Sequence, residues 1–210
     1  MRVIDCVQGT PEWLNARLGV ITGTRLEQAF KHSDALKNQL LSERMATYVI
    51  NESQSRDMER GSALEPVAKK AYEKQYSVTA KDVGFILHPE RNDIGLSPDG
   101  IIGDGTSAVE FKCPKSPAHI EYMRNTQPPR KYIFQLAAYF FNIPTLQSID
   151  FASYDELNEI KPLHKITYTL DDILKTEYLK NKTIGSMDHL ESKVFGFADS
   201  VNEEYQKLVF

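Results

Sequence analysis

Apolar side chains recur at roughly helical spacing in the first part of the chain. The spacing predicts a helix over residues 35–52, in which the apolar positions are Leu36, Leu40, Met45, Val49 and Ile50. A second helix is predicted from Gly61 to Tyr76, and Pro66 should lie in its first turn, where the missing N–H costs little. Thr10 followed by Pro11 is a helix-start signal, so a shorter helix should begin there.

Between Val83 and Cys113 the helical spacing gives way to short apolar runs. Prolines and Asp-Gly or Gly-Asp pairs separate these runs, which cover residues 84–87, 93–96, 100–102 and 108–111. Such punctuation is typical of tight turns, and it predicts an antiparallel meander.

Helices and strands follow this meander. The predicted elements are helices over residues 117–126 and 130–142 and strands over residues 148–154 and 163–169. A helical C-terminal segment should begin at Asp171 and reach about Gln206, with a break near Gly185 or Gly196. The order of the elements predicts an α/β (α+β) fold with a central mixed β-sheet flanked by helices.

The composition fits one domain of that kind. The chain has 210 residues, of which 41% are hydrophobic, so we expect a single domain over residues 1–210 with one sizeable core. The net charge of −4, from 25 basic and 29 acidic residues, counts against a nucleic-acid partner. The objection is weak, because a metal site concentrates acids locally and a basic groove can coexist with an acidic exterior.

The cysteine content and the apolar runs bear on the compartment. Cys6 and Cys113 offer no disulfide framework and indicate a reducing cytoplasm, and two cysteines are too few for a four-cysteine iron–sulfur cluster. No run approaches the roughly 18 apolar residues of a membrane span, and the N-terminus lacks the apolar run of a signal peptide. We therefore expect a cytoplasmic protein that has no membrane partner.

The candidate chemistry lies in two neighbouring segments of the meander. Glu110 and Lys112 are two positions apart on a predicted strand, so they project from one face while Phe111 points away. If Asp99 comes from an adjacent strand or turn, two carboxylates and one ammonium converge. Two carboxylates repel each other, so a divalent cation between them would explain the arrangement, and it would favour a lowered pKa of Lys112. The alternative interpretation is a surface salt bridge on a solvated hairpin.

Other polar residues accompany this triple, and each has an ordinary interpretation as well. Glu65 could reach the same metal, or it is a first-turn glutamate favoured by the helix dipole. Gln135 is a polar residue in an apolar helix, so it either binds the attacking water or a phosphate, or it is a satisfied core amide. Arg17, Thr22 and Thr24 surround a glycine-containing turn and suit a phosphate, or Thr24 is only an N-cap.

Pro98-Asp99 together with Glu110-Phe111-Lys112 resembles the PD…(D/E)xK nuclease motif. A wider resemblance, over about residues 7–141, is to the phage lambda-type recombination exonuclease family, which includes alkaline exonucleases of phages and prophages. Five motifs carry it in order, and they are Trp13…Arg17…Thr22, Gly61…Glu65…Ala68…Tyr72, Ser97-Pro98-Asp99-Gly100, Glu110-Phe111-Lys112-Cys113-Pro114 and Gln135…Tyr139. The resemblance implies a restriction-endonuclease-like PD-(D/E)xK fold.

The resemblance also implies roles at the cleavage centre. Asp99, Glu110 and the carbonyl of Phe111 would bind metal, and Glu65 would help to hold a second ion. The cofactor would be two Mg²⁺ ions, with Mn²⁺ as a substitute, and two such ions can serve the nucleophile, the phosphate and the leaving oxygen. Lys112 would orient or deprotonate the attacking water.

At the other end of the implied site, Gln135 would lie close to that water, and Arg17, Thr24 and Ser97 would bind the 5′-terminal phosphate. The implied activity is digestion of one strand of linear double-stranded DNA from 5′ to 3′, with release of 5′-mononucleotides and a 3′ single-stranded overhang. A single-strand annealing protein and a homotrimeric ring around DNA are the implied partners.

Other interpretations of the motifs remain open. A PD-(D/E)xK endonuclease or resolvase shares the bare triple, although the 13–24 motif and the Gln135 helix argue against it. The fold could also persist as a non-catalytic DNA-binding module, although Asp99, Glu110 and Lys112 are all present. The iron–sulfur branch of the same fold conflicts with the two cysteines.

Overall fold

The structure is a computed structural model that describes residues 1–46 and 56–210. It contains a three-stranded sheet of order β1-β3-β4 and a five-stranded sheet of order β2-β5-β6-β7-β8. The strands are β1 Arg2–Ile4, β2 Ala80–Lys81, β3 Phe85–Leu87, β4 Gly95–Leu96, β5 Gly100–Ile102, β6 Ser107–Lys112, β7 Ser148–Tyr154 and β8 Leu163–Tyr168. The larger sheet is mixed, because β6 and β7 are parallel while its other neighbouring pairs are antiparallel.

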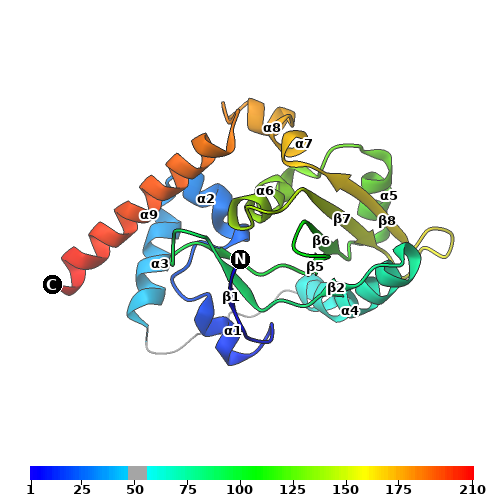
Figure 1. Ribbon diagram of the computed structural model, residues 1–210, viewed down its shortest axis with the longest axis horizontal. Helices are drawn as coiled ribbons and strands as arrows, with labels where there is room; N and C mark the ends of the chain where they lie inside the picture. The colour runs from blue at the N-terminus through cyan, green and yellow to red at the C-terminus, as the bar shows by residue number, and fades with distance from the viewer. Residues whose placement is uncertain (47–55) are drawn as a thin grey trace.

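Helices surround the two sheets (Figure 1). They are α1 Pro11–Ala16, α2 Leu26–Phe30, α3 Asp34–Met45, α4 Arg56–Tyr76, α5 Ser116–Arg124, α6 Ile133–Asn142, α7 Leu170–Leu174, α8 Glu177–Lys180 and α9 Met187–Val209, with short 3-10 turns η1 Gly23–Arg25 and η2 Arg130–Tyr132. None of the helices within the described residues combines the length and the apolar content that a membrane span needs. The prediction of a mixed sheet flanked by helices is confirmed.

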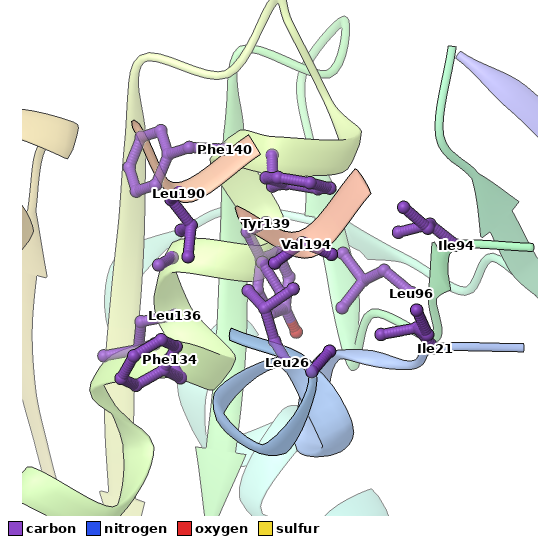
Figure 2. Packing of buried hydrophobic residues seen from close by; sticks show 14 of the residues in the cluster. Ile21, Leu26, Ile94, Leu96, Phe134, Leu136, Tyr139, Phe140, Leu190 and Val194 are labelled. Atoms are coloured by element: carbon purple, nitrogen blue, oxygen red, sulfur yellow. The ribbon is translucent and has the colours of Figure 1, made fainter. Parts of the chain in front are cut away.

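The strand period of two divides β6 between two apolar clusters. Val109 and Phe111 pack with Ala68 and Tyr72 of α4 on one face of the sheet. Ala108 belongs to the larger cluster on the other face, where α6 is buried along its whole length. Figure 2 shows the α6 side chains packed among residues of α2 and α9. Glu110 projects toward the α6 face, so it enters a layer that is otherwise largely apolar.

The structure corrects the predicted meander. The runs at 84–87 and 93–96 pair with each other, and those at 100–102 and 108–111 pair with each other, but the two hairpins belong to different sheets. The segment between β4 and β5, which contains Asp99, therefore passes from one sheet to the other. The spacing within residues 83–113 could not show this, because the outer neighbours, β1 near the N-terminus and β2 at Ala80–Lys81, lie outside that segment.

Several predicted helix boundaries also change. The helix around Pro66 begins already at Arg56, so Pro66 lies in its interior and not in its first turn. A proline there leaves the carbonyl of Ser62 without its usual helical partner. The helix predicted over 35–52 spans Asp34–Met45, and residues 47–52 lie outside the described residues. The C-terminal segment breaks near Gly185, while Gly196 lies inside the continuous helix α9.

Gly100 lets the strands beside Asp99 approach closely. A Cβ atom at Gly100 would lie 2.8 Å from the Cβ of Ala80 and 2.9 Å from the Cγ1 of Val109. These residues are on β2 and β6, the two neighbours of β5. The absence of a side chain at position 100 therefore allows the strand pairing that holds Asp99 beside β6.

Gly100→Ala should lower the free energy of unfolding by about 1–3 kcal/mol, because the added methyl group overpacks the two neighbouring strands. Gly61→Ala is the matched control, since a Cβ at that position inside α4 meets no atom within 4 Å. It should raise the free energy of unfolding by about 0.5–1 kcal/mol. Urea unfolding measures both changes, and a Gly100→Ala variant as stable as the native protein would contradict the close approach.

Candidate active site

The segment before β5 and the end of β6 bring three charged side chains together. The register of β5 and β6 pairs Gly100 with Val109, so Asp99 lies across from Glu110. An Oδ2 atom of Asp99 accepts the backbone N–H of Phe111 at 2.8 Å. The Nζ atom of Lys112 donates to Oε1 of Glu110, and the two form an ion pair. The predicted convergence of two carboxylates and one ammonium is thus present.

The carboxylate of Glu110 is almost fully buried, at 1% exposure, and two side chains of α6 bind it. Nε2 of Gln135 donates to Oε1 at 2.6 Å, and Oη of Tyr139 donates to Oε2 at 2.5 Å. Gln135 and Tyr139 are one helical turn apart, so they lie on the same face of α6. The backbone N–H of Asp99 donates to the Tyr139 hydroxyl at 3.2 Å. One tyrosine therefore links both carboxylate-bearing segments.

Sequence reasoning missed this role of Tyr139. The sequence marked Tyr139 only as the end of the Gln135…Tyr139 motif, and in the structure its ring is fully buried. The hydroxyl is a polar atom that must find a partner when it is buried, and the one-turn spacing from Gln135 indicated where that partner could lie. Gln135 donates to Glu110 in the structure, and its expected contact with the attacking water stays a prediction.

Burial and mutual repulsion set the protonation of these groups. Burial, together with the charge of Glu110, raises the pKa of Asp99 well above its ordinary value. The same two causes raise the pKa of Glu65, which reaches the site from α4. Burial alone would lower the pKa of Lys112, but the charges of Glu110 and Asp99 outweigh it and raise that pKa. Without a bound cation, the neighbouring carboxylates thus favour the ammonium form of Lys112, and the lowering of its pKa expected beside a cation stays a prediction.

A second cluster of polar side chains lies beside α1. The guanidinium of Arg17 stacks on the ring of Trp13, with Cζ 4.0 Å from the ring centroid. Oγ of Ser97 accepts Nε1–H of Trp13 at 2.9 Å and an N–H of Arg17 at 3.4 Å. The hydroxyls of Thr22 and Thr24 lie 3.3 Å apart. Burial and the nearby Arg25 lower the pKa of Arg17 to about 10, which still leaves it charged at neutral pH.

One cavity of about 540 Å³ joins the two clusters. Each residue that the sequence singled out for the site contributes to its lining, namely Arg17, Thr24, Glu65, Ser97, Asp99, Glu110, Phe111, Lys112 and Gln135. Thr22 is part of the lining too, although it is buried while Thr24 is exposed. The structure thus places a cationic, hydroxyl-bearing end and a carboxylate-bearing end in the same hollow.

The donor atoms at the carboxylate end suit a hard cation. Among the described residues, no group of three or more His, Cys, Asp or Glu side chains is arranged to hold a metal by itself. Asp99, Glu110 and the Phe111 carbonyl supply oxygen only, and Mg²⁺ takes oxygen ligands and retains several waters. Burial, and after it the charge of Glu110, raises the pKa values of Asp99 and Glu65, and a divalent cation bound between these groups would favour their ionised forms.

The model of the YqaJ-like viral recombinase domain family matches residues 12–141, which is more than half of the chain. This range contains all of the residues described above. A comparison with curated proteins gives no significant match.

Solved structures resemble the whole chain. The alkaline exonuclease LHK-Exo from Laribacter hongkongensis is 29% identical, with a TM-score of 0.79 over 95% of this chain and 96% of that chain. The structure of LHK-Exo in complex with dAMP gives 28% identity and a TM-score of 0.77 over the same shares. A phage related exonuclease from Haemophilus somnus 129PT is 13% identical, with a TM-score of 0.59 over 90% of this chain and 95% of that chain, and this likeness concerns the fold alone.

Asp99→Asn should raise the thermal unfolding midpoint by a few degrees in the presence of a chelator at neutral pH. The folded protein holds the Asp99 proton more tightly than the unfolded chain does. The stability that Asp99 contributes is therefore present in acid and is lost as the pH rises through its folded-state pKa. Asparagine keeps an acceptor for the Phe111 N–H and carries no charge, so the loss of stability with rising pH should disappear in this variant.

The control is Asp104→Asn, which makes the same charge change in an exposed turn. Unfolding midpoints in chelator, measured at a series of pH values, compare the two variants with the native protein. If Asp99→Asn and Asp104→Asn shift the midpoint equally, the repulsion between the site carboxylates is not what destabilises the protein.

Proposed function

Because the chain belongs to the family of YqaJ-like viral recombinase domains, we propose that it is a Mg²⁺-dependent 5′-to-3′ exonuclease for linear double-stranded DNA. The fold is the α/β fold of the alkaline exonucleases, of the restriction-endonuclease-like PD-(D/E)xK type. The protein is a nuclease of the lambda-type recombination exonuclease family, as its motifs predicted. The proposed products are 5′-mononucleotides and a 3′ single-stranded overhang.

The observation that carries the direction and the product is the shared cavity. Arg17 and the two threonines suit a terminal phosphate, since a guanidinium and hydroxyls donate to phosphate oxygens. If that group is the 5′ phosphate, the next phosphodiester lies toward Asp99 and Glu110, and its cleavage frees one nucleotide. LHK-Exo was solved with dAMP, which is a nucleoside monophosphate of the size that this reaction releases.

Asp99, Glu110 and the Phe111 carbonyl would hold one Mg²⁺, and Glu65 would help to hold the second, with Mn²⁺ as a substitute. The ions would neutralise phosphate charge and lower the pKa of bound water. Gln135 and Tyr139 both donate to the carboxylate of Glu110, and these hydrogen bonds fix its orientation toward the proposed metal site.

The remaining polar side chains bind and orient the substrate. Lys112 would orient or deprotonate the attacking water, and while no cation is bound the carboxylates beside it favour its ammonium form, which is a donor and a positive charge. Arg17 is held in place by Trp13 and Ser97, which fixes the distance between the bound 5′ phosphate and the reacting bond. Such fixed positioning is a large part of catalysis in sites of this kind.

The proposed assembly is a homotrimeric ring around DNA, which passes the 3′-ended strand to a single-strand annealing protein in the cytoplasm of a bacterial host. The net charge of −4 supports a ring, because topological confinement needs less basic surface than tight binding does.

Linear duplex DNA labelled at the 5′ end of one strand and the 3′ end of the other tests the proposal directly. With Mg²⁺, the 5′ label should be released rapidly as a mononucleotide, and Lys112→Ala should abolish the release. Internal cuts would identify an endonuclease, and absence of cleavage by the native protein would favour a non-catalytic DNA-binding module.

Arg17→Ala should reduce kcat/KM on 5′-phosphorylated ends by about ten- to a hundredfold, which is the effect of losing a hydrogen bond to a charged group. The loss should be much smaller on 5′-hydroxyl ends of the same sequence, which serve as the internal control. Initial rates of nucleotide release from the two substrates give the comparison. Equal losses on both ends would remove Arg17 from phosphate recognition.

A further inference from the structure

The ring of Tyr132 connects the cleavage centre with a second polar surface. Nζ of Lys112 lies 4.9 Å from the ring centroid, and Nζ of Lys131 lies 4.7 Å from the same centroid. Cations at these distances are attracted by the ring face. Lys112 faces the cavity of the cleavage centre, whereas Lys131 is exposed, so the ring lies between the site and the outer surface.

The same alternation of cations and rings continues beyond Lys131. Cζ of Arg130 lies 4.4 Å from the ring centroid of Tyr178, and Nζ of Lys182 lies 4.9 Å from that centroid. A hollow of about 510 Å³ is lined by Arg130, Lys131 and Tyr178 together with the acidic side chains of Glu27 and Glu121. We call the set Lys131, Tyr132, Arg130, Tyr178 and Lys182 the basic–aromatic surface.

Carboxylates neutralise only part of this charge. Glu27 forms ion pairs with Lys31 at 2.6 Å and with Lys182 at 3.9 Å, and it accepts the hydroxyl of Tyr178. Arg130 and Lys131 are exposed, and their charged groups lie over aromatic rings, which orient them without neutralising them. In a protein of net charge −4, this is a local concentration of cations that an incoming anion can use.

We propose that the basic–aromatic surface binds the phosphate backbone of the DNA substrate outside the cleavage centre, an inference that rests on the proposed nuclease function. Tyr132 makes the surface continuous with Lys112, so a chain of phosphates could extend from one to the other. The cations cover the faces of Tyr132 and Tyr178, which favours contact with phosphates over stacking of bases.

Only a short stretch of helix separates this surface from the cleavage centre along the chain. Arg130 and Lys131 lie in η2, which leads directly into α6, and Gln135 of α6 donates to Glu110. A DNA backbone bound at η2 would therefore be held at a fixed distance from the cleavage centre, because about one turn of helix joins η2 to Gln135. The surface would thus keep the substrate aligned between successive cleavage events.

The test is the double substitution Arg130→Gln with Lys131→Gln, measured by fluorescence anisotropy with a short labelled blunt duplex in chelator. Each lost phosphate contact flattens the plot of log affinity against log salt by about one unit, so the double variant should lower the slope by about two units. The matched control, Lys193→Gln with Lys207→Gln, removes two exposed cations from α9 and should keep the native slope. A native slope and affinity in the Arg130/Lys131 variant would overturn the proposal.

A second measurement separates this proposal from the proposed function. Cleavage of the p-nitrophenyl ester of thymidine 5′-phosphate in Mg²⁺ uses a substrate too small to reach η2, so the double variant should keep the native rate. A proportional loss on this ester would mean that the substitutions disturb the centre, and it would overturn the proposal. A native protein inactive on all DNA would refute the proposed function, while the salt slopes would still decide whether the surface binds phosphate.

Discussion

Glu110 places a negative charge in a layer of the protein that is otherwise largely apolar. A buried carboxylate without partners is strongly unfavourable, and removing one member of a buried charge pair typically costs about 3–5 kcal/mol. Lys112, Gln135 and Tyr139 all donate to this one carboxylate. The position of α6 on the sheet is therefore tied to the chemistry, because two of the three donors come from that helix.

The rest of the fold holds β6 and α6 in this relation. β6 is an inner strand of the five-stranded sheet, with β5 on one side and β7 on the other, so its backbone is fixed along its length. α4 covers the opposite face through Ala68 and Tyr72, and the ring of Tyr72 meets Phe111 edge-on with centroids 5.5 Å apart. Alternate residues of a single strand thus anchor the sheet and present Glu110 and Lys112.

Local sequence patterns predicted the parts of the site that depend on local geometry. The alternation of a strand is enough to place Glu110 and Lys112 on one face, and helical spacing is enough to mark α6 and Gln135. The division into two sheets depends on pairing with two strands outside residues 83–113, namely β1 near the N-terminus and β2 just before the segment. Tyr139 was missed because an aromatic run in a buried helix looks the same whether or not one hydroxyl has a polar partner.

The interior position of Pro66 is another feature that local sequence patterns did not predict. A proline is usually expected in the first turn of a helix, and only the packing of α4 across β6, β7 and β8 explains why the helix extends back to Arg56. The cationic, hydroxyl-bearing end of the cavity was recognisable from Arg17 and the threonines, but its distance from the carboxylates was not. That distance follows from the passage of the chain between the two sheets, which brings Ser97 and Asp99 into one cavity.

The account depends on Asp99 and Glu110 acting as one cation-binding centre. Titration of the protein with Mn²⁺, followed by the loss of the free-ion electron paramagnetic resonance signal, tests this without reference to activity. Glu110→Gln should weaken Mn²⁺ binding by more than about tenfold, since even the loss of a partner of a ligand has an effect of that size, whereas Asp104→Asn should leave it unchanged. Equal Mn²⁺ affinity in the native protein and the Glu110→Gln variant would contradict the account.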